Sequence, residues 1–369
     1  AAAVLAAGRA WNEAFEKAGF KNAIQMKIQP DDADWDAGDI RYNVIRWTSA
    51  PTAPFGGFGP RVVNPRSGQI IGADIMLDTV FATSRIRYEK MFAVGESPGS
   101  APAGPSCLAA KFAQMNNIVG RTVLRSRGFG EVKQGELLDQ GIRELVLHEM
   151  GHSLGLNHNF IASQMLPTDE LYSQETTGRL GTAGSVMEYS PANVAPRGRE
   201  QGLFYDVRPG PYDRWAIEYG YSQALDNAQA EQARLDAILA RSTERALWFA
   251  NDADDMRSPG AGIDPRVMIF DRSSDAIQYA ENQFGLIRDT VADLTGVYAS
   301  PGGSWQEMVT AYLMLGGWYS AQAAVVSRYV GGVYVDRAVQ GQAGATEPYR
   351  PVPLAEQRRA LATLGRYVF

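Results

Sequence analysis

The stretch His148-Glu149-Met150-Gly151-His152-Ser153-Leu154-Gly155-Leu156-Asn157-His158 contains every histidine of this 369-residue chain. Histidines that serve only in packing have no reason to gather in one short segment. Histidine is the commonest protein ligand of metal ions, so a cluster of all three indicates a bound metal. The fold of the rest of the chain therefore has to hold these three histidines around one metal ion.

The spacing of the cluster predicts how the ligands are presented. Residues four apart lie one above the other on a helix, so His148 and His152 can hold one ion from the same face. Glu149 need not touch the metal and is placed to act as general base on a water molecule. Gly155 can end the helix and turn the chain, which lets His158 return as a third ligand. Three neutral imidazoles leave a tetrahedral zinc ion one open position, as in catalytic sites.

The full pattern H-E-x-x-H-x-x-G-x-x-H resembles the zinc signature of the metzincin metalloproteases. A second stretch, Ser185-Val186-Met187-Glu188-Tyr189, is similar to the methionine turn of that superfamily. The resemblance implies that Met187 packs beneath the imidazoles as an apolar floor. It also implies that Tyr189 occupies the place of a tyrosine that, in the astacin and serralysin branches, stabilises the transition state. Ordinary packing is the alternative for each of these two residues taken alone.

The resemblance extends over most of the chain. The segment 211–220 resembles the helix that closes the metzincin catalytic domain, and matches from Trp11 to Tyr221 resemble a bacterial family of large, poorly characterised metzincin-like proteases. That family implies an exported protein, periplasmic, outer-membrane-associated or secreted, with further N-terminal domains in a longer precursor. The chain begins at Ala1 and residues 1–7 lack a charged leader, so we expect an excised piece without a signal peptide.

We expect an α+β fold in two parts. A metzincin-like catalytic domain, 1–221, would place a twisted mixed sheet over a metal-binding helix from about residue 134 to 154. Val146, Met150 and Leu154 recur at helical spacing and give that helix an apolar face. A mainly helical C-terminal domain, 222–369, would pack alongside.

Two strand-like runs, 58–63 and 69–77, flank a strong turn signal. In metzincins a strand at this point is the free edge above the cleft. Phe58, Gly59 and Arg61 are therefore candidates for binding an extended peptide by strand addition. An ordinary hairpin without a substrate role is the alternative.

Two further segments carry weaker signals. Ile24, Met26 and Ile28 alternate with polar residues, a pattern that predicts a half-buried strand. Residues 159–184 are rich in Ser, Thr and Gly, which predicts a surface loop that shapes specificity.

Composition limits the partners. The net charge is −6 and there is no long basic run, which argues against a nucleic-acid partner. No apolar stretch has the length needed to span a bilayer. The acidic group Asn251, Asp252, Asp254 and Asp255 suggests a calcium loop, but its spacing does not match an EF-hand, and helix caps or solvated loop residues explain it better.

These observations predict a zinc-dependent endopeptidase with one catalytic Zn²⁺, a peptide or protein substrate, and Glu149 as general base. Two alternatives come from other classes. A zinc amidase or deacylase acting on a non-protein amide would use the same water chemistry. A binding module would carry zinc only as a structural ion, or its cleft would be plugged by its own chain.

Overall fold

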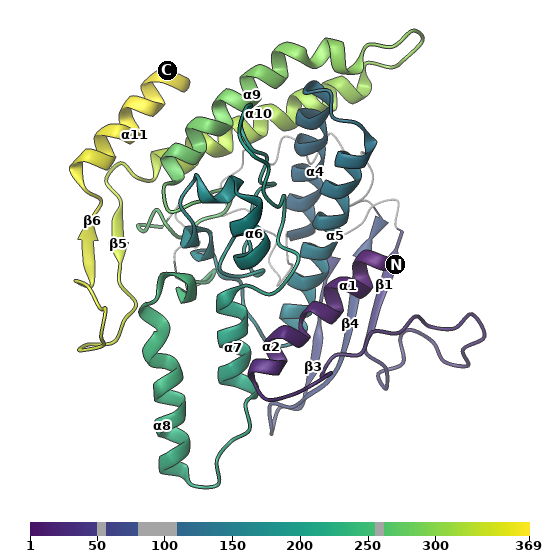
Figure 1. Cartoon of the computed structure of the whole chain (residues 1–369), viewed down its shortest axis with the longest axis vertical. Helices are drawn as coiled ribbons and strands as arrows, with labels where there is room; N and C mark the ends of the chain where they lie inside the picture. The colour runs from purple at the N-terminus through teal and green to yellow at the C-terminus, as the bar shows by residue number, and fades with distance from the viewer. Residues whose placement is uncertain (50–56, 80–108, 255–261) are drawn as a thin grey trace.

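The computed structural model describes residues 1–49, 57–79, 109–254 and 262–369 (Figure 1). The strands are β1 (Val44–Thr48), β2 (Gly57–Phe58), β3 (Arg61–Val63), β4 (Ile70–Asp78), β5 (Val333–Val335) and β6 (Tyr349–Pro351). The longer helices are α1 (Ala2–Ala10), α2 (Asn12–Lys17), α4 (Ala109–Ser126), α5 (Glu131–Ser153), α6 (Gln174–Leu180), α7 (Pro211–Tyr221), α8 (Ala228–Leu239), α9 (Ala276–Tyr298), α10 (Gln306–Ser327) and α11 (Leu354–Tyr367).

The larger sheet is mixed, as the sequence predicts. Strand β1 runs parallel to β4, whereas β2 and β3 pair antiparallel with the other side of β4. The predicted turn is present: Asn64 N–H donates to the carbonyl of Gln69 (2.9 Å), and Gly68 adopts a φ of 74° that suits glycine. The described sheet therefore ends at β2 and β3 on the side where a free edge was expected.

Helix α5 lies between two hydrophobic cores and is the centre of the molecule. On one side, Leu145, Val146 and Leu147 join a core with α1, α2 and β4. On the other side, Leu137 joins a core built from α4, α9 and α10. The first core thus anchors the end of α5 that carries His148 and His152, and the second core anchors the beginning of the helix.

The methionine turn packs directly onto α5. Met187 is fully buried, and a Cβ atom added to Gly151 would overlap its sulfur and lie 3.5 Å from the ring of Trp11. Gly151 lies between the two helical histidines. A glycine at this point is needed because the turn approaches the helix backbone so closely.

The C-terminal part is mainly helical, as expected, with one short hairpin of β5 and β6. Figure 1 shows α9 and α10 side by side across the end of α4, with α11 beyond them. This part is tied to the catalytic part by backbone hydrogen bonds: Phe160 N–H donates to Ala250 (2.8 Å), and Met268 N–H donates to Phe160 (3.1 Å). The division at residue 221 stays a prediction, but the two sides interlock.

Two predictions of local structure were wrong. Residues 24–28 form no strand, because the side chain of Asn12 takes both backbone groups of Ile24 (2.9 Å each), and Met26 packs against Gly8. The connection 159–184 is not a simple surface loop. Its residues 160–164 are buried, and it contains α6 and two short 3₁₀ turns.

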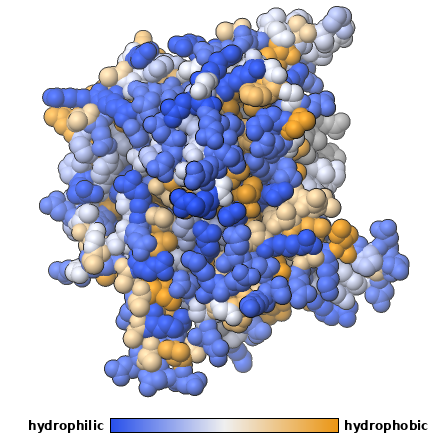
Figure 2. Space-filling view, viewed as in Figure 1, coloured by the Kyte–Doolittle hydropathy of each residue, from blue (hydrophilic) through white to orange (hydrophobic). Residues whose placement is uncertain are grey.

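The outer surface is largely polar. Figure 2 shows that hydrophilic residues dominate the face drawn there, with hydrophobic residues in small groups between them. Within the described ranges, every helix is too short or too polar to cross a membrane.

The contact between Gly151 and Met187 generates a prediction. Gly151→Ala should lower the free energy of unfolding by roughly 1–3 kcal/mol, because the added methyl group overpacks a buried contact. Gly135→Ala, on an open part of the same helix, is the matched control and should raise it by about 0.5–1 kcal/mol. Urea unfolding of both variants checks this, and equal effects would show that the close approach carries no energetic weight.

Candidate active site

The three histidines come together at the end of α5. His148 and His152 lie one turn apart on the helix, which ends at Ser153, and Gly155 follows two residues later with a φ of 98°. Gly155 N–H donates to His152 (3.0 Å), and Leu156 N–H donates to Gly151 (2.9 Å). These two bonds form a Schellman motif, which reverses the chain and brings His158 back to the helical pair.

Each imidazole is oriented through its Nδ1 atom. His148 Nδ1 lies 2.7 Å from the carbonyl of Val186, and His152 Nδ1 lies 3.1 Å from the carbonyl of Leu156. His158 Nδ1 lies 2.8 Å from the carboxylate of Asp252. All three partners only accept hydrogen bonds, so Nδ1 carries the proton and Nε2 keeps its lone pair for a ligand.

The Nε2 atoms face one another. Those of His152 and His158 are 3.2 Å apart, and one ligand nitrogen from each of the three rings falls within 4.8 Å of the other two. Two lone pairs at that distance repel unless a cation lies between them. Tetrahedral zinc with bonds of about 2.0–2.1 Å separates its ligand atoms by roughly 3.4 Å. The donor set therefore fits a zinc ion.

The protonation state of the cluster also fits a metal. Burial, and then the neighbouring His152 and His158, lower the pKa of His148 well below its usual value. Burial and the His158 ring lower the pKa of His152 to about 4. His148 and His152 are therefore neutral near pH 7, which is the form that binds metal.

Tyr189 lies beside the cluster, as the resemblance implies. Its hydroxyl is 3.0 Å from His158 Nε2, and its ring lies 5.2 Å from that of Phe160. The Tyr189 side chain is only 8 % exposed, so packing holds its hydroxyl beside His158. Met187, two residues before Tyr189, packs against Gly151 of α5.

The edge strand reaches the candidate base. Glu149 is fully buried, and a Cβ atom added to Gly59 would lie 3.0 Å from its Oε2 atom. Arg61 donates from Nη1 to the carbonyl of His152 (2.8 Å). The crossover from β2 to β3 therefore runs against the metal-binding turn of α5. The side chain of Phe58 lies outside the described residues.

A buried carboxylate ties the methionine turn to α7. Asp213 accepts hydrogen bonds from Ser185 Oγ (2.5 Å), Val186 N–H (2.9 Å) and Gly210 N–H (2.7 Å). Burial raises the pKa of Asp213 to about 7, and these three bonds oppose that rise. Asp213 thereby fixes Val186, whose carbonyl orients His148. The sequence predicted the helix that carries Asp213, but not the hydrogen bonds that Asp213 makes to the methionine turn.

Asp252 is the functional residue that sequence reasoning missed. It belongs to the acidic group considered for calcium, yet its carboxylate binds His158, 94 positions earlier. Its neighbours make local bonds: Asp254 accepts from Asn251 N–H (2.6 Å), and Asn251 accepts from Ala253 N–H (2.8 Å). Among the described residues the three histidines alone form a group able to hold a metal, and Asp255 lies outside them.

Two histidines four residues apart on one helix, with a glutamate after the first, form the H-E-x-x-H pattern that marks the zincin class of proteins. Residues 130–369, well over half of the chain, match the family described as Met-zincin, so the chain belongs to that family. The match confirms the metzincin resemblance and the fold class. No curated protein and no solved structure matches the chain.

The bond from His158 to Asp252 generates a prediction. Asp252→Asn should weaken zinc binding about 10- to 100-fold, because the carboxylate fixes the ring and raises its basicity. The exposed Asp226→Asn is the control and should bind zinc as the wild type does. A competition titration with a chromophoric chelator measures both, and equal affinities would contradict the role of Asp252.

Proposed function

We propose that this protein is a zinc-dependent endopeptidase. One observation carries the proposal: three imidazoles converge on one point, with a buried glutamate on the same helix turn and a tyrosine hydroxyl beside them. Membership of the Met-zincin family supports zinc metallopeptidase activity in general. His148, His152 and His158 would hold the ion.

The reaction would be hydrolysis of an amide bond. When bound, zinc would supply a Lewis acid that acidifies a water molecule and polarises the scissile carbonyl. Glu149 would accept the proton of that water as its oxygen attacks the carbonyl carbon. Glu149 would then give the proton to the amide nitrogen as the C–N bond breaks, leaving a carboxylic acid and an amine, and the acid then loses its proton to the amine.

Tyr189 would stabilise the negative charge on the carbonyl oxygen. Its hydroxyl is already near His158 Nε2, so a small movement turns it towards a substrate oxygen. A hydrogen-bond donor aimed at developing charge contributes mainly in the transition state. Tyr189 is therefore expected to affect turnover more than metal binding.

The edge formed by β2 and β3 is the proposed path of the substrate. Gly59 brings this edge against Glu149, and an extended peptide could continue the sheet there through backbone hydrogen bonds. Such binding would use backbone groups more than side chains. It would favour a peptide over a small amide.

Glu149→Ala tests the proposed base. It should reduce cleavage of a peptide library by at least about 10²-fold, because general-base catalysis typically contributes that much. Zinc content should stay at the wild-type level, since Glu149 is not a ligand. A parallel screen of acylated and cell-wall amides distinguishes an amidase, and equal peptide cleavage by both proteins would refute the role of Glu149.

Tyr189→Phe tests the second proposed group. The change removes only the hydroxyl, so kcat should fall about 10²-fold with KM and zinc content nearly unchanged. Tyr219→Phe, an exposed tyrosine on α7, is the matched control and should keep full activity. An unchanged kcat in Tyr189→Phe would leave Tyr189 a packing residue.

A further inference from the structure

A second cavity lies apart from the metal cluster. Its volume is about 550 Å³, within the range of roughly 300–1,000 Å³ that small-molecule sites occupy. It lies between α7, the segment 239–249 and the hairpin of β5 and β6. The residues that line it, among those described, do not include the three histidines.

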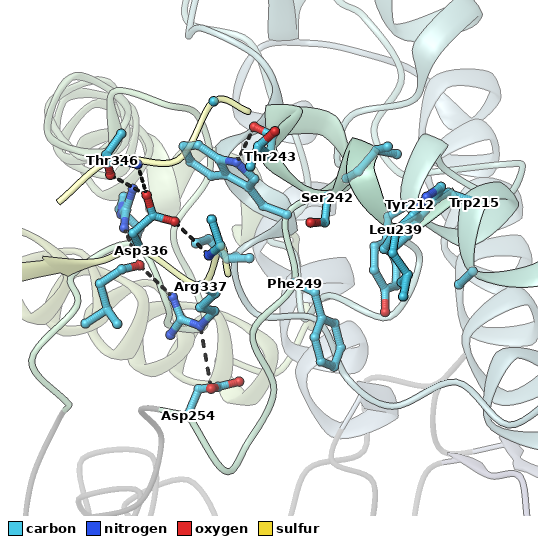
Figure 3. A pocket seen from close by; sticks show the side chains of 18 of the residues that line it. Tyr212, Trp215, Leu239, Ser242, Thr243, Phe249, Asp254, Asp336, Arg337 and Thr346 are labelled. Atoms are coloured by element: carbon cyan, nitrogen blue, oxygen red, sulfur yellow. Dashed lines mark hydrogen bonds and ion pairs between the residues drawn. The ribbon is translucent and has the colours of Figure 1, made fainter. Parts of the chain in front are cut away.

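One end of the cavity is aromatic. Figure 3 shows Tyr212, Trp215 and Leu239 gathered on one side, with Phe249 between them and the opposite wall. Tyr212 stacks on Phe249 with ring centroids 5.4 Å apart and an interplanar angle of 5°. These packed rings offer a preformed surface for an aromatic or large aliphatic group.

The other end is polar, and most of its groups are already paired. Asp336 accepts from Thr346 and from Ala338 N–H (2.8 Å), as Figure 3 shows in part. Arg266 is neutralised by the buried Asp264, with bonds of 3.0 and 2.8 Å. These groups have little left to offer a ligand.

The groups that keep free hydrogen-bonding capacity are donors. The side chain of Arg350 makes no ion pair or hydrogen bond within the described part of the chain and lies over the ring of Tyr334. Arg337 donates from Nη1 to the carbonyl of Val335 (3.2 Å) and lies 3.5 Å from Asp254 and from Asp264. Both arginines line the cavity, and a guanidinium with N–H groups left over suits a carboxylate.

Acceptors lie between the two ends. Asp254 lines the cavity: one of its oxygens accepts from Asn251 N–H (2.6 Å), and the other lies 3.5 Å from Arg337. Ser242 also lines the space, and its hydroxyl accepts from Gln342 Nε2 (2.8 Å), so each of these oxygens keeps one further lone pair. Oxygen atoms at these points can accept from amide N–H groups. A ligand with an apolar group, an amide and a carboxylate therefore matches the cavity along its length.

We propose that this cavity binds the C-terminal residue of a peptide. Its aromatic or large aliphatic side chain would lie against Tyr212 and Phe249, and its carboxylate would bind Arg350 and Arg337. This is a binding site separate from the proposed catalytic centre. It needs no hydrolysis to operate.

Calorimetric titration of the full chain with N-acetyl-Phe-Phe tests the proposal, using the free acid and the C-terminal amide. The acid should bind at least about tenfold more tightly than the amide, because only the acid presents a charged acceptor. Arg350→Ala should abolish that difference. Arg358→Ala, an exposed arginine of α11, should preserve it.

A second pair of variants tests the apolar end. Leu239→Ser at the rim should weaken the acid and the amide alike, whereas Leu361→Ser, similarly exposed on α11, should weaken neither. Equal binding of acid and amide, or a difference that survives Arg350→Ala, would overturn the proposal. Binding of decanoate without binding of the peptide acid would overturn the assignment to a peptide.

Discussion

The structure depends on three hydrogen bonds that orient three imidazole rings. Val186, Leu156 and Asp252 each accept from one Nδ1 atom, so the unprotonated Nε2 atoms point at one another. That arrangement is unfavourable without a cation, because lone pairs at 3.2 Å repel. The packing around α5 holds the rings in place despite that repulsion, and a bound cation would remove the repulsion.

The ligands themselves could be predicted from the sequence because they are local. His148 and His152 follow from helical periodicity, and His158 follows from a glycine that reverses the chain. Met187 and Tyr189 followed from a resemblance, and the structure places Met187 against Gly151 and the Tyr189 hydroxyl beside His158. In this chain, short-range geometry was enough to identify the three histidines that could hold a metal ion.

The groups that orient the ligands could not be predicted, because they are distant in the sequence or belong to the backbone. Asp252 looks like any loop aspartate until the chain folds it onto His158. The carbonyl of Val186 has no side-chain signature at all. The missing strand at residues 24–28 has a similar cause, since Asn12 satisfies the backbone of Ile24 in a way that periodicity does not report.

The origin of the three acceptors has a thermal consequence. They come from the helix-terminal turn, the methionine turn and a segment beyond residue 222, so a metal ion held by the rings fastens three distant parts of the chain together. A ligand that binds only the folded form stabilises it by RT ln(1 + [L]/Kd), about 4 kcal/mol when the ligand concentration is 1,000 times Kd. Zinc should therefore delay heat inactivation and protect these three segments from cleavage by an added protease.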